Sequence, residues 1–82
     1  MPENTTDREL TYGEKTVGLT FNPSSDPVVD EIKRSYAAII DRLNNQRSAT
    51  EDGESKRLYS VAITEAQAAQ MWAVKAITWQ NN

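Results

Sequence analysis

A continuous stretch of this chain, from about Ser55 to Trp79, contains neither Gly nor Pro and carries apolar side chains on several sides of a helix. One stripe, at spacings of three and four residues, consists of Tyr59, Ala62, Ala66, Ala69, Ala73 and Ala76. A second stripe consists of Leu58, Val61, Ala68, Trp72 and Trp79, with Glu65 and Lys75 in its polar gaps. Because one neighbouring helix covers only one such stripe, this pattern predicts a long helix with more than one packing partner.

A shorter helix is predicted before it, over about residues 27–44. Asp26 suits the N-cap and Pro27 suits the first helical position. The apolar positions of this helix also repeat at spacings of three and four residues, namely Val29, Ile32, Tyr36, Ile39 and Leu43. A polar, Gly-containing loop over residues 44–53 leads to the long helix, at about residues 55–79. We therefore expect an antiparallel two-helix hairpin.

The segment before these helices has the alternation that is typical of strands. Val17, Leu19 and Phe21 alternate with small or polar residues, and residues 12–15 suit a turn. The sequence thus predicts a short β-hairpin at about residues 10–21, which needs support from the helices or from another subunit. Residues 1–9 have little apolar area to bury and are expected to form a flexible tail. Residues 10–82 then form a single helical-hairpin domain.

The small size of the chain makes self-association the expected way to cover the remaining apolar stripe. A chain of 82 residues hides only roughly 60–65% of its extended surface on folding. There is no Cys to form a disulfide, and without Cys or His a structural zinc site is not expected. The alternative is that the N-terminal segment folds over the spare face. The expected fold class is mainly α, a helical hairpin assembled into an oligomer.

Composition also excludes several classes of function. Without Cys or His the chain has no thiolate nucleophile and no imidazole base. Its carboxylates are explained by a helix cap, by the helix dipole or by a loop without calcium-binding spacing, so neither an enzyme nor a metal or cofactor is expected. The net charge of -3 disfavours binding to duplex DNA. The polar start lacks a signal-peptide layout, and no apolar run reaches the roughly 18 residues of a membrane span, so a cytoplasmic protein without a membrane partner is expected.

Cationic side chains on the two helices are the candidates for binding an anion. Lys33 flanks the apolar stripe of the first helix, and the plain alternative is a solvated edge residue. Arg57 opposes the helix dipole at the start of the second helix, so it either pairs with Asp41 or Glu54 or binds an anionic ligand. Lys75 interrupts an apolar stripe, which burial of its stem and the helix dipole also explain.

Hairpin geometry limits which of these residues meet. If Asn44 faces Ser55, Lys33 lies level with about residue 66, within reach of Thr64 but about 13 Å from Arg57 along the axis. Thr64 has the alternative of bonding back to its own helix. Lys33 and Arg57 are therefore expected to converge only across a subunit interface.

The single Phe of the chain, Phe21, lies shortly before a helix N-terminus. Free N–H groups at such an end attract phosphate, and an aromatic ring beside them is suited to stack on a base. The structural alternative is a hydrophobic staple for the helix. Both interpretations remain open at this point.

Two stretches of the sequence together resemble a known family. The first contains residues 18–24 (GLTFNPS) and 29–33 (VDEIK), and the second contains Arg57-Leu58, residues 62–67 (AITEAQ) and residues 71–76 (MWAVKA). They resemble the small helical-hairpin proteins that phages use against the CBASS and Thoeris defence systems, the anti-CBASS/anti-Thoeris hairpin family. The resemblance spans about residues 12–79.

This resemblance implies a sponge, a protein that binds cyclic nucleotide signals made by bacterial immune enzymes and does not cleave them. The implied ligands are cyclic dinucleotides, cyclic trinucleotides and cyclic ADP-ribose variants. It further implies dimers and higher oligomers, often hexamers, with pockets between subunits, in the cytosol of the infected host cell. The alternative is a helical hairpin that binds another protein and has no nucleotide ligand.

Position by position, the resemblance implies a ligand-binding set of Phe21, Asn22, Asp30, Lys33, Arg57, Thr64 and Lys75. Phe21 matches an aromatic residue that stacks on a base, while Lys33 and Arg57 match phosphate contacts. Asp30 stands where some members have Asn, which fits a contact to a base or ribose. Lys75 replaces an Arg of some members, so it lacks bidentate geometry. Asn22 belongs to the first motif, and Thr64 matches a pattern position without an assigned role.

Overall fold

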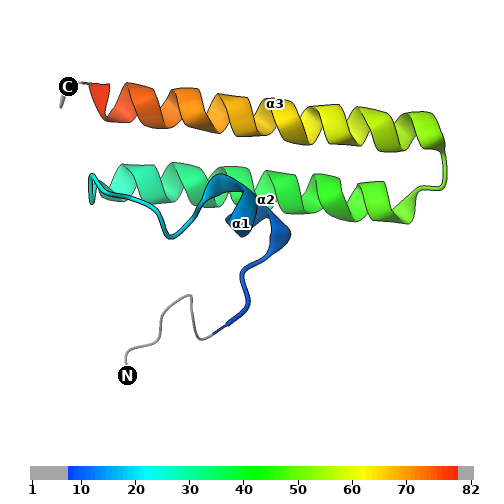
Figure 1. Cartoon of the computed structure of the whole chain (residues 1–82), viewed down its shortest axis with the longest axis horizontal. Coiled ribbons are helices and arrows are strands. Elements are labelled where there is room, and N and C mark those ends of the chain that lie inside the picture. The colour runs from blue at the N-terminus through cyan, green and yellow to red at the C-terminus, as the bar shows by residue number, and fades with distance from the viewer. Residues whose placement is uncertain (1–7, 80–82) are drawn as a thin grey trace.

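The computed structural model of the protein describes residues 8–79, which form three α-helices. They are α1 (Tyr12–Val17), α2 (Pro27–Ala49) and α3 (Gly53–Ile77). The two long helices lie side by side and run in opposite directions, and α1 packs on α2 (Figure 1). The predicted antiparallel helical hairpin is thereby confirmed, whereas its oligomeric state stays a prediction. The predicted flexible tail lies almost wholly outside the described residues.

Helix α2 begins where the sequence predicts and ends later. The Asp26 carboxylate accepts from the backbone N–H of Val28 at 2.9 Å, and Pro27 is the first helical residue. Instead of ending near residue 44, the helix continues to Ala49. The Arg47 guanidinium supports this extension, because it donates to Asn44 Oδ1 and to Ser60 Oγ of α3, both at 2.8 Å. Only residues 50–52 connect the two long helices.

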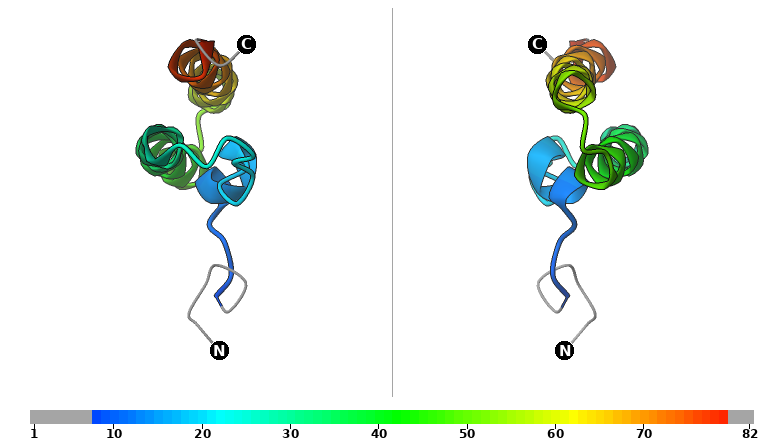
Figure 2. Two further views of the ribbon diagram at one scale, coloured as in Figure 1. Left: turned by 90° about the vertical axis from the view of Figure 1, so that its left-hand side faces the viewer. Right: turned by 90° about the vertical axis from the view of Figure 1, so that its right-hand side faces the viewer.

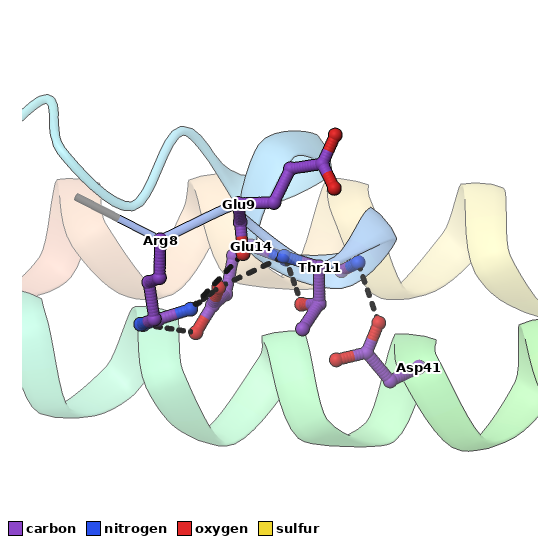
Figure 3. A network of polar contacts seen from close by, with 6 residues as sticks. Arg8, Glu9, Thr11, Glu14 and Asp41 are labelled. Atoms are coloured by element: carbon purple, nitrogen blue, oxygen red, sulfur yellow. Dashed lines mark hydrogen bonds and ion pairs between the residues drawn. The ribbon is translucent and has the colours of Figure 1, made fainter. Parts of the chain in front are cut away.

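The predicted N-terminal β-hairpin is wrong, because residues 12–17 form α1 and residues 8–79 contain no strand. Thr11 and Glu14 form a capping box, in which the Glu14 N–H donates to Thr11 Oγ1 at 3.1 Å and the Thr11 N–H donates to Glu14 Oε1 at 2.9 Å. The Arg8 guanidinium also pairs with the Glu14 carboxylate at 2.7 Å (Figure 3). These contacts fix the start of a helix that is too short to show a helical apolar period.

Gly18 explains why the sequence alternation is misleading. It ends α1 in the left-handed conformation, with φ at 65°, and this turn redirects the chain. Val17 and Leu19, which lie on either side of it, are therefore both buried, with exposed fractions of 4% and 6%. The alternation of Val17 and Leu19 around Gly18 therefore marks the end of a helix in this chain and not a strand.

Helix α1 approaches α2 unusually closely at Gly13. The Gly13 N–H donates to Asp41 Oδ1 at 2.7 Å, and Figure 3 shows this carboxylate reaching from α2 to the start of α1. A Cβ atom at position 13 would lie 2.1 Å from the backbone oxygen of Ala37. Only glycine fits this contact, and it holds the segment that leads to Phe21 against α2.

The core is small and lies on one side of α3. It consists of Val17, Leu19, Ala37, Ile40 and Ile63, with Tyr36, Leu43 and Ala66 packed against it. In the end-on views, α1 and α2 lie together on the same side of α3 (Figure 2). The described N-terminal segment therefore does not cover the spare face of α3. No helix within residues 8–79 has the length and hydrophobicity needed to cross a bilayer.

Candidate ligand-binding site

A hollow of about 220 Å³ lies where the turn after α1 meets the start of α2 and the end of α3. It is lined by Phe21, Asn22, Pro23, Ser24, Val29, Lys33, Val74 and Thr78. Three of the predicted ligand-binding residues, Phe21, Asn22 and Lys33, therefore lie in one place. Sequence reasoning missed the contribution of α3, where Val74 and Thr78 are spaced one helical turn apart.

Lys33 is the cation of this hollow, and it is not a solvated edge residue. Only 6% of its surface is exposed. Its Nζ donates to the backbone oxygen of Gly18 at 3.0 Å and also to the backbone oxygen of Phe21. An ammonium group has three N–H donors, so these two bonds leave one for a further acceptor. Lys33 thus fixes the turn between α1 and α2 and also lines the hollow.

Phe21 projects from that turn. The residue is 69% exposed, which does not fit a packed hydrophobic staple, and the Lys33 ammonium lies 5.5 Å from the ring centroid. An exposed aromatic face next to a cation is suited to stack on a base while the cation interacts with a phosphate.

Asn22 organises the rest of the turn. Its Nδ2 donates to the backbone oxygen of Asp26 at 2.9 Å and to Asp30 Oδ1 at 3.0 Å. Its Oδ1 accepts from Ser24 Oγ at 2.7 Å. Ser25, inside this turn, has a positive φ of 60°. Asn22 and Asp30 thus act first as the supports that fix the loop carrying Phe21.

Arg57 lies at the other end of the hairpin, in the first turns of α3. Its guanidinium pairs with the Glu54 carboxylate at 2.6 and 3.0 Å, and both side chains are 61% exposed. This pair lowers the pKa of Glu54 and raises that of Arg57. The sequence left Asp41 and Glu54 as possible partners of Arg57, and the structure shows the pair with Glu54. The Asp41 carboxylate instead accepts from the backbone N–H of Gly13 in α1. An exposed pair of this kind dissociates at little cost when a stronger anion arrives.

The other two predicted residues lie elsewhere on α3. Thr64 is exposed and does not line the hollow that contains Phe21. Lys75 lies over the ring of Trp79, 5.7 Å from its centroid. It also lines a second, open hollow together with Ala68, Met71 and Trp72.

The predicted helix register needs a correction. Lys33 shares its hollow with Val74 and Thr78, not with Thr64. The expected facing of Asn44 with Ser55 is wrong because α2 is longer and the connection shorter than predicted, so that Arg47 bonds Ser60 across the hairpin. Arg57 then lies about 25 Å from Val74 along the axis of α3, so one chain does not bring Arg57 to the hollow.

Comparison with known proteins gives one family. The family model described as "Acb2/Tad1, hairpin domain" matches residues 14–78, which contain α2, α3 and every predicted ligand-binding residue. No curated protein and no solved structure matches the chain.

Proposed function

The chain belongs to the Acb2/Tad1 hairpin family of anti-CBASS and anti-Thoeris sponges, and on that basis we propose that it binds and sequesters a cyclic nucleotide immune signal without cleaving it. The proposed ligands are cyclic oligonucleotides or cyclic ADP-ribose variants. The proposed site is the hollow at Phe21, completed by residues from another copy of the chain. By holding the signal, the protein suppresses the antiviral response of the host cell.

The observation that carries this proposal is the grouping of an exposed aromatic ring with a buried cation on a fixed loop. Phe21 and Lys33 line one hollow, and the bonds of Asn22 to Asp26 and Asp30 hold the loop before any ligand arrives. Preorganisation of this kind lowers the entropy lost on binding. In the bound state, Phe21 stacks on a base and the third N–H of Lys33 donates to a phosphate oxygen.

Arg57 enters the proposed site from another subunit. The guanidinium is exposed and binds phosphate with bidentate geometry after leaving Glu54. Because Arg57 and the hollow lie at opposite ends of α3 in one chain, only assembly brings them together. Thr64 and Lys75 remain proposed contacts of secondary rank, since neither lies at the hollow that contains Phe21.

A thermal-shift and calorimetric panel of cyclic dinucleotides, cyclic trinucleotides and cyclic ADP-ribose variants tests the proposal. A true ligand at a hundredfold excess over its Kd stabilises the folded state by about 2.7 kcal/mol. We expect Phe21→Ala to lose this stabilisation and Ile39→Ala, a matched control at a half-exposed apolar position of α2, to keep it. The ligand recovered after heating the complex is expected to be intact. Absence of a shift with every nucleotide would overturn the proposal.

A second candidate function is a protein-binding hairpin, and the uncovered apolar face of α3 favours it. Leu58, Trp72 and Trp79 are 52%, 69% and 63% exposed. Surface patches of this kind mark sites of association between proteins. The same panel separates the two candidates, because a protein-binding hairpin gains no stability from any nucleotide.

A further inference from the structure

The outer face of α3 carries one continuous stripe, which we call the outer stripe. Its members are Leu58, Val61, Glu65, Ala68, Trp72, Lys75 and Trp79, at alternating spacings of three and four residues. Five large apolar residues are exposed in α3 or just after its end, and they include four of this set, Leu58, Val61, Trp72 and Trp79, the last of which lies two residues beyond Ile77. By helical periodicity the stripe lies opposite Ile63 and Ala66, the α3 residues of the core. Figure 2 shows α1 and α2 together on one side of α3.

Two copies of the outer stripe match each other in size and charge when they run in opposite directions. If two copies pack antiparallel about a two-fold axis level with residue 70, the numbers of facing residues add up to 140. Val61 then faces Trp79, Glu65 faces Lys75, and Ala68 faces Trp72. Each ring meets an aliphatic side chain and the acid meets the base, so these three contacts are of a favourable kind, while Leu58 lies outside the match.

Neighbouring registers lose this match. A shift by one heptad in one direction sets Glu65 against Ala68 and Lys75 against Leu58. A shift in the other direction sets Lys75 against Trp72 and leaves Glu65 without a basic partner. Within one chain Glu65 and Lys75 are ten residues apart, about 15 Å along the helix, so they do not pair with each other. No hydrogen bond or ion pair of Glu65 is present within residues 8–79.

We propose that the outer stripe is the interface with a second copy of this chain, packed antiparallel in the register that pairs Glu65 with Lys75 and Ala68 with Trp72 of the partner subunit. This inference rests on the assembly that the proposed function requires and specifies how two subunits meet. The occupant is a second copy because the stripe is complementary in both charge and size to itself, a property that an unrelated partner does not need. Covering two tryptophans also removes large apolar area from water.

The same register bears on the ligand site. In this register Arg57 lies about 9 Å along the axis past Ile77, the last residue of the partner subunit's α3. Arg57 of the partner subunit therefore lies at the end of the hairpin that holds Val74, Thr78 and the hollow with Phe21. It is offset from Thr78 by about 8 Å along the axis. The register thus places a second cation at the same end of the hairpin as the hollow, which one chain does not do.

Charge reversal tests the register in solution. Glu65→Lys and Lys75→Glu each replace two attractive contacts across the two-fold axis with repulsive ones, so we expect each to weaken dimerisation tenfold or more, as measured by light scattering and sedimentation at low salt. The double variant exchanges the charges and is expected to restore the native dissociation constant. Glu51→Lys and Lys15→Glu change the net charge equally at exposed positions outside the stripe and serve as controls.

Engineered disulfides test the geometry directly, because the chain has no Cys of its own. Positions 61 and 79 are about 27 Å apart along one helix but face each other across the proposed interface. A chain with both Val61→Cys and Trp79→Cys is expected to oxidise to a covalent dimer, whereas each single variant stays uncrosslinked. A chain with both Val61→Cys and Trp72→Cys places its cysteines opposite each other only in a register shifted by one heptad. It is the control and is expected to stay uncrosslinked.

The outcomes separate the two proposals. A native chain that stays monomeric at all concentrations overturns both the assembly and the interface. A native oligomer whose mass does not respond to Glu65→Lys, or whose double-cysteine variant does not crosslink, overturns the register alone and leaves nucleotide binding to be judged by the ligand panel. A monomer that binds a different protein through this face overturns the second copy as the occupant.

Discussion

Replacing Gly13 with Ala tests whether the docking of α1 on α2 controls the position of the candidate site. The added Cβ would lie 2.1 Å from the backbone oxygen of Ala37 and 2.9 Å from Asp41 Oδ1. Ordinary contacts of this kind begin at about 3.4 Å, so α1 must move away from α2 by about 1 Å. The backbone of α2 cannot yield as a flexible side chain does, and the 2.7 Å bond from Gly13 to Asp41 is lost or stretched.

The expected size of the effect follows from three contributions. Overpacking costs about 1–3 kcal/mol, and loss of a hydrogen bond to a charged acceptor costs about 1.5–3 kcal/mol. The higher helix propensity of Ala returns about 1 kcal/mol. We therefore expect the free energy of unfolding to fall by about 1.5–5 kcal/mol, and each kcal/mol lowers Tm by roughly 4–8 °C in a chain of this size.

Urea denaturation at one fixed protein concentration measures this change, and Gly53→Ala supplies a matched control. Gly53 also begins a helix, but a Cβ there meets nothing within 4 Å. The same substitution at position 53 is therefore expected to be neutral or stabilising by up to about 1 kcal/mol. If Gly13→Ala is stabilising like Gly53→Ala, then α1 is not held against α2 at Gly13 and does not fix the loop that carries Phe21.

Two further predictions concern the same end of the molecule. Lys33→Met leaves the Gly18 and Phe21 carbonyls without their donor. We expect the free energy of unfolding measured by urea denaturation to fall by about 2–4 kcal/mol, and hydrogen exchange in residues 18–22 to become faster. Unchanged exchange would contradict this role of Lys33. Hydrogen bonding by Arg8 lowers the pKa of Glu14 to about 2, below its ordinary value of 4.5. The resulting stability is present above about pH 4.5 and is lost as the pH falls toward 2, a slope that Glu14→Gln is expected to flatten.

The sequence predicts those parts of the fold that rest on long periodic patterns and strong caps. Asp26 and Pro27 place the start of α2 correctly, and the long stretch without Gly or Pro is α3. The sequence predicts the end of α2 too early because the polar residues after Leu43 look like a loop. The bonds of Arg47 to Asn44 and, across the hairpin, to Ser60 explain why they stay helical. Long-range contacts of this kind leave no local signal.

Helix α1 did carry a local signal that the alternation of apolar residues obscured. Thr11 and Glu14 have the spacing of a capping box, and Gly18 follows at the distance expected for a helix end. The candidate site was predictable in part for the same reason. Phe21 and Lys33 are recognisable from the resemblance and do lie together. The burial of Lys33 is not predictable from the sequence. It depends on the backbone oxygens of Gly18 and Phe21, which accept from Lys33 only because the chain turns at the left-handed Gly18.

A mixing experiment joins the proposed ligand site to the proposed interface. If each pocket takes Phe21 from one chain and Arg57 from the other, then Phe21→Ala and Arg57→Ala each inactivate both pockets of a symmetric dimer. A mixed dimer of the two variants has one pocket with both substitutions and one pocket with neither.

The mixed dimer therefore regains one native pocket out of two. When equal amounts are refolded together, half of the dimers are mixed, so about a quarter of all pockets are expected to bind ligand with native affinity in a calorimetric titration. A pocket built within one chain predicts no recovery at all, because every chain then carries a damaged site. The fraction of active sites thus decides whether Arg57 acts across the subunit boundary, independently of which cyclic nucleotide is the preferred ligand.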